Sequence, residues 1–286
     1  MWDVAGKTVL ITGSSAGIGF EAAVALTRLG ARILLVGRDR GRTEAAVVAL
    51  RDRAEVTAEA HLCDFSSQES IREFARTIQH DHARLDVLVN NAGGIHKARS
   101  VTVDGLETTF ATNHLGYFLL TNLLRDLIVR SAPARIVTVA SIGHRHGTLD
   151  FDDLGYERGG YGLRKAYERS KLANVLFANE LARRLEGTGV TSNSVHPGSV
   201  ATDLWSDIPV WTKPLVAIAV RPWFLTPEQG GAAVVQLAAS PELAGVTGQY
   251  FEGGRPVAPS RVAQDAAIGR RLWDVSEHLV NLPSSG

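Results

Sequence analysis

Cysteine, net charge and long apolar runs are all scarce in this chain of 286 residues. Its one cysteine, Cys63, cannot form an internal disulfide, so nothing indicates an oxidising compartment. Its 30 basic and 30 acidic residues cancel, which argues against the clustered positive charge of nucleic-acid-binding or basic membrane-surface proteins. No apolar run approaches the roughly 18 to 20 residues that span a bilayer, and residues 1–7 lack signal-peptide features. We therefore expect a cytoplasmic protein with no membrane span and no nucleic-acid partner.

Apolar residues, by contrast, make up 45% of the chain, against 21% charged residues, so a sizeable core can form. Short apolar runs alternate with stretches of helical periodicity, which is typical of βαβ units. This pattern predicts an α/β fold, a doubly wound parallel sheet (Rossmann fold), in a single domain over residues 1–286. The expected strands are Lys7–Thr12, Arg32–Gly37, Glu55–Cys63, Leu85–Asn90, Arg135–Ala140, Thr191–His196 and Gln249–Phe251. The expected helices are Ile18–Leu29, Arg40–Arg53, one opened by a Ser66/Glu69 capping box, Asp104–Val129, Tyr167–Glu186, Thr226–Ala239 and a C-terminal helix at 260–279.

The segment from Gly198 to Leu225 interrupts the alternation and is rich in proline and tryptophan. A loop of this length inside a compact domain is typical of a lid or a binding loop. Its apolar side chains would suit a lipophilic or aromatic substrate, although lid residues also pack for purely structural reasons. These side chains are Trp205, Trp211, Leu215, Val216, Ile218, Trp223 and Phe224.

Two glycine-containing turns follow predicted strands. The run Thr12–Gly19 joins the first strand to the first helix, where unpaired N–H groups and the helix dipole favour a bound phosphate. Its glycine spacing departs from G-x-G-x-x-G, and the glycines could instead serve tight packing between strand and helix. The second turn, Asn90–Gly93, ends the fourth strand at the edge where ligands of open α/β sheets bind, although Asn and Gly are also ordinary turn formers.

Tyr167 and Lys171 are four residues apart, which places the phenol and the ammonium on one face of a helix. A Lys charge about 4 Å away could supply roughly the 4 kcal/mol needed to lower the pKa of a tyrosine by about 3 units. The pair could therefore act as a general acid/base. Tyr161 and Lys165 have the same spacing, but Tyr161 lies among glycines and is expected in the loop before the helix.

Together these motifs resemble the short-chain dehydrogenase/reductase family, whose members carry T-G-x-x-x-G-x-G, N-N-A-G and Y-x-x-x-K in this order. The resemblance extends from about Gly6 to Leu282. Within the family, four stretches look like the retinol-dehydrogenase-like branch: Thr112–Leu124, Ser170–Phe177, Thr226–Gly230 and Gly245–Phe251.

The resemblance implies four catalytic residues. Ser141 would hydrogen-bond the substrate oxygen, and Asn113 would hold a water in the proton relay. Tyr167 would exchange the proton, while Lys171 would bind the nicotinamide ribose and lower the pKa of Tyr167. The interval between Ser141 and Tyr167 is longer than in many members, but the retinol-dehydrogenase-like branch has a similar insertion.

The resemblance also implies the residues that bind the cofactor. Arg38, at the end of the second strand, favours NADP over NAD, since Gly37 stands where NAD users place an acidic residue. Asp39 is the counterargument because it could pair with Arg38, and Arg42 is a weaker candidate. The expected cofactor-binding residues are Gly13, Ser14, Ser15, Gly17, Ile18, Gly19, Arg38, Asp64, Phe65, Asn91, Ala92, Gly93, Tyr167, Lys171, Pro197, Gly198, Val200 and Thr202.

The sequence thus predicts an NADP-dependent oxidoreductase that moves hydride between nicotinamide and a small-molecule carbonyl or alcohol. An NAD-dependent alcohol dehydrogenase and a non-catalytic nucleotide-binding sensor remain the alternatives, and a homo-oligomer is neither required nor excluded. No metal is expected, because His144 and His146 have no carboxylate or cysteine at ligand spacing.

Overall fold

A computed structural model describes residues 2–53, 58–198 and 225–283. One eight-stranded sheet runs in the order β3-β2-β1-β4-β5-β6-β7-β8. Pairing is parallel from β3 through β7, and only β8 is antiparallel, which confirms the predicted doubly wound sheet. The strands are β1 (Thr8–Thr12), β2 (Arg32–Gly37), β3 (Ala58–Leu62), β4 (Val87–Asn90), β5 (Ala134–Val139), β6 (Val190–His196), β7 (Tyr250–Glu252) and β8 (Arg255–Pro256).

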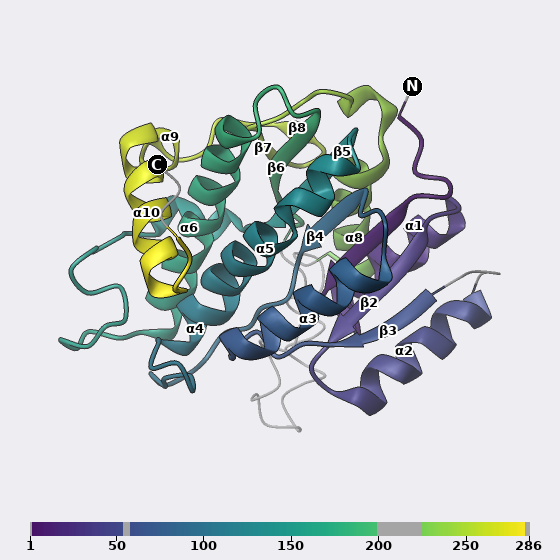
Figure 1. Cartoon of the computed structure of the whole chain (residues 1–286). Coiled ribbons are helices and arrows are strands. Elements are labelled where there is room, and N and C mark those ends of the chain that lie inside the picture. Colours follow the sequence, from purple (N-terminus) through teal and green to yellow (C-terminus); the bar gives the residue numbers. More distant parts are fainter. Residues whose placement is uncertain (1, 54–57, 199–224, 284–286) are drawn as a thin grey trace.

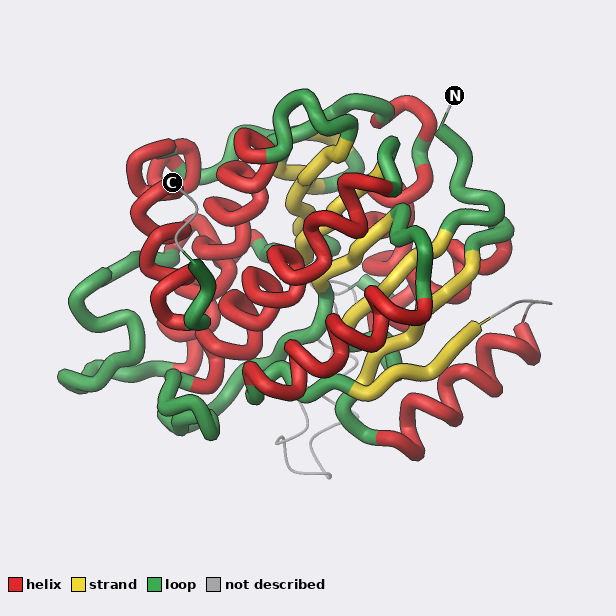
Figure 2. The backbone as a smooth tube through the Cα atoms, viewed as in Figure 1, coloured by secondary structure: helices red, strands yellow, loops and turns green. Residues whose placement is uncertain are grey.

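Helices cover both faces of the sheet (Figures 1 and 2). Alternate residues of each strand point to opposite faces, so Leu10 packs under one helical layer while Val9 and Ile11 pack under the other. The first layer holds α3 (Gln68–Asp81), α5 (Gly116–Arg130) and α6 (Leu163–Arg184), with α10 (Ala266–Leu279) packed on α6. The second holds α1 (Gly17–Arg28), α2 (Arg40–Arg53) and α8 (Pro227–Ala239). Short helices complete the described chain: α4 (Thr108–Phe110), the π-helix η1 (Ala111–Leu115), the 3-10 helices η2 (Ile142–His146) and η5 (Pro241–Leu243), and α9 (Arg261–Gln264).

The chain reverses direction across the sheet at β1. It leaves β1 for β2 and β3 on one side, then returns to β4 on the other side of β1. Ligands of open α/β sheets bind at the carboxyl ends of strands at such a switch point. The carboxyl ends of β1 and β4 therefore mark where a site should be built.

The helix predicted from Asp104 begins only at Thr108. Gly105 sits in a turn with φ +77°, and the Glu107 carboxylate accepts the N–H groups of Thr109 and Phe110 to cap the helix. The chain then forms the π-helix η1 before continuing as α5.

Other boundaries also differ from the sequence prediction. The N-cap of α3 is Ser67, whereas Ser66 hydrogen-bonds the Asp64 carboxylate, so the predicted Ser66 cap is wrong. The predicted C-terminal helix divides into α9 and α10 because Asp265 caps a new helix. Strand β8 and the earlier start of α6, at Leu163, were also missed.

The lid predicted over residues 198–225 lies outside the described residues except for its ends. Those ends are close together, since a Cβ atom on Gly198 would collide with the side chain of Leu225. None of the helices in the described ranges is both long enough and apolar enough to cross a bilayer.

Candidate active site

The Thr12 hydroxyl joins the carboxyl ends of β1 and β4. It accepts the backbone N–H groups of Asn91 and Ala92, at 2.8 and 2.9 Å, and donates to the carbonyl of Val89 at 3.2 Å. The side-chain amide of Asn91 donates hydrogen bonds to the backbone carbonyls of Thr12 and Gly13. The two turns found in the sequence are thus one rigid unit.

Glycine is required at several points of this unit. Gly13 and Gly17 have φ of +64° and +61°, and a Cβ atom on Gly13 would lie 2.6 Å from the Cα of Ala92. A Cβ atom on Gly19 would lie 2.5 Å from the Asn91 amide nitrogen. Within the described residues no side chain caps α1, and its first turn contains no acid. This bare helix N-terminus behind a glycine turn fits the diphosphate of a dinucleotide.

Ser14, predicted among the cofactor-binding residues, belongs to the framework of the turn. Its buried hydroxyl donates to the carbonyl of Ile11 at 2.7 Å and accepts the N–H of Val36 at 3.0 Å. Its own N–H is bonded to the Val36 carbonyl at 3.1 Å. Neither donor is left for a ligand, so Ser14 holds the turn to β2 instead.

The end of β2 carries an exposed Arg38. The Asp39 carboxylate accepts the backbone N–H of Arg42 at 2.8 Å, and no ion pair joins Asp39 to Arg38 in the part of the chain that is described. A Cβ atom on Gly37 would collide with the hydroxyl of Thr43, which is itself buried. The end of β2 therefore presents the exposed guanidinium of Arg38 with no carboxylate at position 37.

The loop after β3 contributes Asp64 and Phe65. Asp64 is exposed, and its carboxylate is hydrogen-bonded to the N–H and hydroxyl of Ser66. The ring of Phe65 packs edge-on against Tyr117, and a Cβ atom on Gly116 would lie 2.6 Å from it. The Phe65 side chain thus packs against α5.

Ser141, Tyr167 and Lys171 come together at the carboxyl end of β5. Tyr167 and Lys171 lie in the first turns of α6, and the Lys171 Nζ is 5.5 Å from the centre of the tyrosine ring. Lys171 is buried and donates to the carbonyl of Val139 at 3.0 Å. The Ser141 hydroxyl accepts the N–H of Gly143 at 3.1 Å, and a Cβ atom on Gly143 would lie 3.5 Å from this hydroxyl oxygen and 3.8 Å from the Tyr167 ring.

Burial controls the protonation of this group. It lowers the pKa of Lys171 to about 8 and raises the pKa of Tyr167 above its ordinary value, while the nearby Ser141 hydroxyl acts in the opposite direction on the pKa of Tyr167. The expected net lowering of the Tyr167 pKa is therefore not found. A phenol with a raised pKa is held in its protonated form, which suits a proton donor.

Asn113 lies on the π-helix and connects the two halves of the site. Its amide donates to the carbonyl of Gly94 at 2.9 Å and to the hydroxyl of Ser170 at 3.1 Å, and its oxygen accepts the N–H of Gly94. Ser170 in turn donates to the carbonyl of Tyr167 at 2.7 Å. Asn113 thus clamps the turn after β4 to the helix that carries Tyr167, and in this arrangement its polar atoms bond protein groups, where a water was expected.

His144 is a residue of the site that sequence reasoning assigned no role. Its Nε2 accepts the backbone N–H of Ser260 at 3.1 Å, so its Nδ1 carries the proton and donates to the Ser141 carbonyl at 2.7 Å. Burial lowers the pKa of His144, which keeps it in this neutral form. With both nitrogens bonded, His144 positions the Ser141 loop. No sequence motif marks it, because Ser260 is distant in the chain.

The remaining predicted residues lie at the carboxyl edge of the sheet or outside the described residues. Pro197 and Gly198 follow β6 directly, whereas Val200 and Thr202 lie outside the described residues. Tyr161 precedes α6 as expected, and its hydroxyl donates to the carbonyl of His96 at 2.7 Å, away from Lys171.

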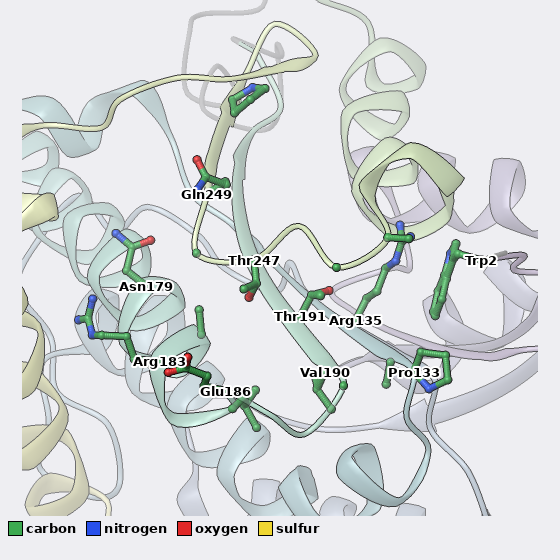
Figure 3. Close-up of a pocket in the computed structure, with 18 of the residues that line it drawn as sticks. Trp2, Pro133, Arg135, Asn179, Arg183, Glu186, Val190, Thr191, Thr247 and Gln249 are labelled. Atoms are coloured by element: carbon green, nitrogen blue, oxygen red, sulfur yellow. The ribbon is translucent and has the colours of Figure 1, made fainter.

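A hollow of about 1230 Å³ lies at the opposite edge of the sheet (Figure 3). Pro133 and Val190, at the amino ends of β5 and β6, line it, as do Trp2, Arg135 and Glu186. None of the residues implicated in catalysis lines it. Size alone therefore does not locate the chemistry in this fold.

Comparison with known proteins identifies the family of this chain. The model of the short chain dehydrogenase family matches residues 7–213. The chain belongs to the short-chain dehydrogenase family. Human retinol dehydrogenase 14 is 44% identical over 97% of this chain and 87% of its own, and human retinol dehydrogenase 13 is 42% identical over 98% and 86%. These relatives identify the retinol-dehydrogenase-like branch.

Solved structures agree with the family. An uncharacterised protein of Mycobacterium paratuberculosis superposes with a TM-score of 0.80 at 32% identity, covering 99% of this chain and 96% of that one. The Pseudomonas aeruginosa RhlG/NADP active-site complex gives 0.71 at 26% identity, covering 93% and 98%. This short-chain dehydrogenase is accordingly an NAD(P)-dependent oxidoreductase acting on CH–OH or C=O groups.

Proposed function

We propose that this short-chain dehydrogenase uses NADP and transfers hydride to or from a lipophilic or aromatic carbonyl or alcohol, with Tyr167 as the general acid/base. One observation carries the proposal: Ser141, Tyr167 and Lys171 converge beside the glycine turn at one edge of the sheet. A protein that only sensed the nucleotide would not need this proton-transfer group.

The preference for NADP rests on the end of β2. Arg38 offers a planar set of donors that matches phosphate oxygens, and the collision between a Cβ at Gly37 and Thr43 excludes a competing acid. A structural relative is named as an NADP complex, which supports the same choice.

Each residue has a part in the proposed chemistry. The dinucleotide, when bound, supplies the hydride donor or acceptor. In reduction, Tyr167 passes its hydroxyl proton to the substrate oxygen, and Ser141 donates a hydrogen bond to the same oxygen. Lys171 holds the ribose and places positive charge near the phenolate that Tyr167 becomes. Asn113 and His144 hold these groups in place through Ser170 and the Ser141 carbonyl.

The lipophilic substrate is supported by the apolar side chains of the sequence between Gly198 and Leu225, and by relatives named retinol dehydrogenases. A cytoplasmic location stays a prediction.

Replacing Tyr167 by Phe tests the proposal. The variant should bind NADPH almost normally but lose at least about 100-fold in kcat, because general acid/base catalysis contributes roughly 10² to 10⁴. Tyr161→Phe is the matched control, since it removes the same atom from the neighbouring tyrosine, and its kcat should stay within about twofold. Steady-state oxidation of NADPH with a panel of aldehydes and ketones measures both. Unchanged turnover in Tyr167→Phe would contradict the proposal.

A further inference from the structure

A cluster of possible metal ligands lies away from the site described above, on the edge strand β3. Glu59 and His61 are two residues apart on this strand, so their side chains point to the same face of the sheet. They lie beside Leu34 and Val36 of β2 on the face that α3 covers. His82, the residue that ends α3, reaches the same place.

The ligand atoms of these three side chains all lie within 4.8 Å of one another. One Glu59 oxygen is 3.7 Å from the Nε2 atom of His61 and 3.7 Å from the Nε2 atom of His82. These separations exceed hydrogen-bonding distance. Ligand atoms about 2.0 to 2.1 Å from a tetrahedral ion would be about 3.3 Å apart, so small side-chain movements would close the cluster around an ion.

The two imidazoles have buried nitrogens that nothing in the described structure satisfies. The Nε2 atoms of both His61 and His82 are inaccessible to solvent and have no hydrogen-bond partner among the described residues. Unpaired buried polar atoms are costly and call for a water or an ion. A neutral imidazole with a free lone pair is the form that binds a metal.

From this geometry we propose that Glu59, His61 and His82 bind one zinc-type divalent cation, joining the edge strand β3 to the end of α3. Two imidazoles and one carboxylate are a ligand set that suits zinc, and Glu59, with 41% of its side chain exposed, leaves room for water as a fourth ligand. The sequence predicts no metal only as far as His144 and His146 are concerned; Glu59, His61 and His82 do not enter that prediction.

An edge strand can also carry an inward-pointing charge simply to prevent pairing with another sheet. That explanation accounts for Glu59. It does not account for two imidazoles from different elements whose unpaired nitrogens face the same carboxylate. The cation would instead bind β3 to the end of α3. Strand β3 pairs with β2, and Arg38 follows the carboxyl end of β2.

Zinc chloride is titrated into tag-free, chelator-treated protein in competition with a chromogenic chelator. We expect one ion per chain and a Tm about 5 °C higher at saturating zinc. His61→Gln and His82→Gln should each raise the dissociation constant at least about tenfold. The control is His80→Gln, because His80 lies in the same helix end but is paired with Asp81 in solvent. It should leave zinc binding unchanged.

Diffraction from the unmodified protein soaked in zinc, recorded at the zinc absorption edge, keeps the proposal testable if a variant fails to fold. An anomalous peak between Glu59, His61 and His82 supports it. A peak elsewhere only, no saturable binding, or equal losses in His80→Gln and His61→Gln would overturn it.

Discussion

The two edges of the sheet differ in what they offer a ligand. At the amino edge lies a hollow of about 1230 Å³, lined by side chains such as Trp2, Arg135 and Glu186. At the carboxyl edge the described chain is tightly packed: a Cβ atom on Gly13 or Gly93 would collide with Ala92 or Asn113, and the polar side chains of Asn113 and Lys171 are buried. The first edge has volume, and the second has groups whose pKa values and hydrogen bonds are set by burial.

This difference shows that strand direction, not cavity size, places the chemistry. Every parallel strand from β1 to β6 delivers its last residues to the same edge, where the positive end of α1 also points. The predictions below test whether function resides at the carboxyl edge alone.

Lys171→Met should produce the largest effect. Loss of the ammonium removes a ribose contact and a charge beside Tyr167, so kcat should fall at least about 100-fold and cofactor binding should weaken. The free energy of unfolding should rise by about 1 to 3 kcal/mol near neutral pH, because the variant has no ammonium group that must lose its water when the protein folds. The carbonyl of Val139 keeps a partner in Asn174 at 3.3 Å.

The lowered pKa of Lys171 should make the stability of the protein depend on pH. Its pKa is about 8 in the folded protein and near 10.5 in the unfolded chain, so the unfolded state holds more protons between these values. The stability of the unmodified protein should therefore rise across that window, and the Lys171→Met variant should lose this rise. Denaturant unfolding at about pH 7 and about pH 9.5 measures it. A variant less stable at both pH values would refute the argument.

Arg38→Ala comes next in size. Charge-assisted hydrogen bonds are worth about 1.5 to 3 kcal/mol, so the dissociation constant of NADPH should rise about tenfold to a hundredfold while that of NADH stays nearly constant. Quenching of tryptophan fluorescence by each cofactor gives both constants.

Arg42→Ala separates the two candidate arginines, since Arg42 is also exposed but its backbone, not its side chain, is bonded to Asp39. If Arg38 binds the 2′-phosphate, Arg42→Ala should leave the dissociation constant of NADPH nearly unchanged. Equal affinity of the unmodified protein for NADH and NADPH would contradict the role of Arg38. Gly37→Asp is unsuitable as a test, because any side chain at position 37 meets Thr43.

His144→Asn should have the smallest effect. An Asn amide can still donate to the Ser141 carbonyl, but the N–H of Ser260 loses its acceptor, so stability should fall by about 1 to 2 kcal/mol and kcat by less than about tenfold. The pKa of His144 is lowered in the folded protein, so its contribution is present above about pH 6.5 and is lost as pH falls through the lowered value.

The difference in Tm between the protein and His144→Asn should consequently narrow from about pH 7.5 to about pH 5. A difference that does not depend on pH would show that the Ser260 hydrogen bond is not linked to the protonation of His144.

Local patterns predicted most of the fold and the centre of the site. Alternating apolar runs predicted the parallel strands, and the spacing of Tyr167 and Lys171 correctly placed the two residues on one face of a helix. Contacts between distant residues were not predictable in this way. The bond from Ser260 to His144 spans 116 positions, and His82 meets β3 only after α3 has packed. The capping roles of Ser67 and Glu107 were missed because competing acceptors stand next to them.

A crystal structure of the protein with NADP tests the central claim most directly. The account predicts the diphosphate against the N–H groups of Gly17–Gly19, the 2′-phosphate on the Arg38 guanidinium, and the nicotinamide ribose within hydrogen-bonding distance of Lys171. A dinucleotide bound in the hollow at the amino edge, or one that leaves Arg38 and Lys171 without contacts, would contradict it.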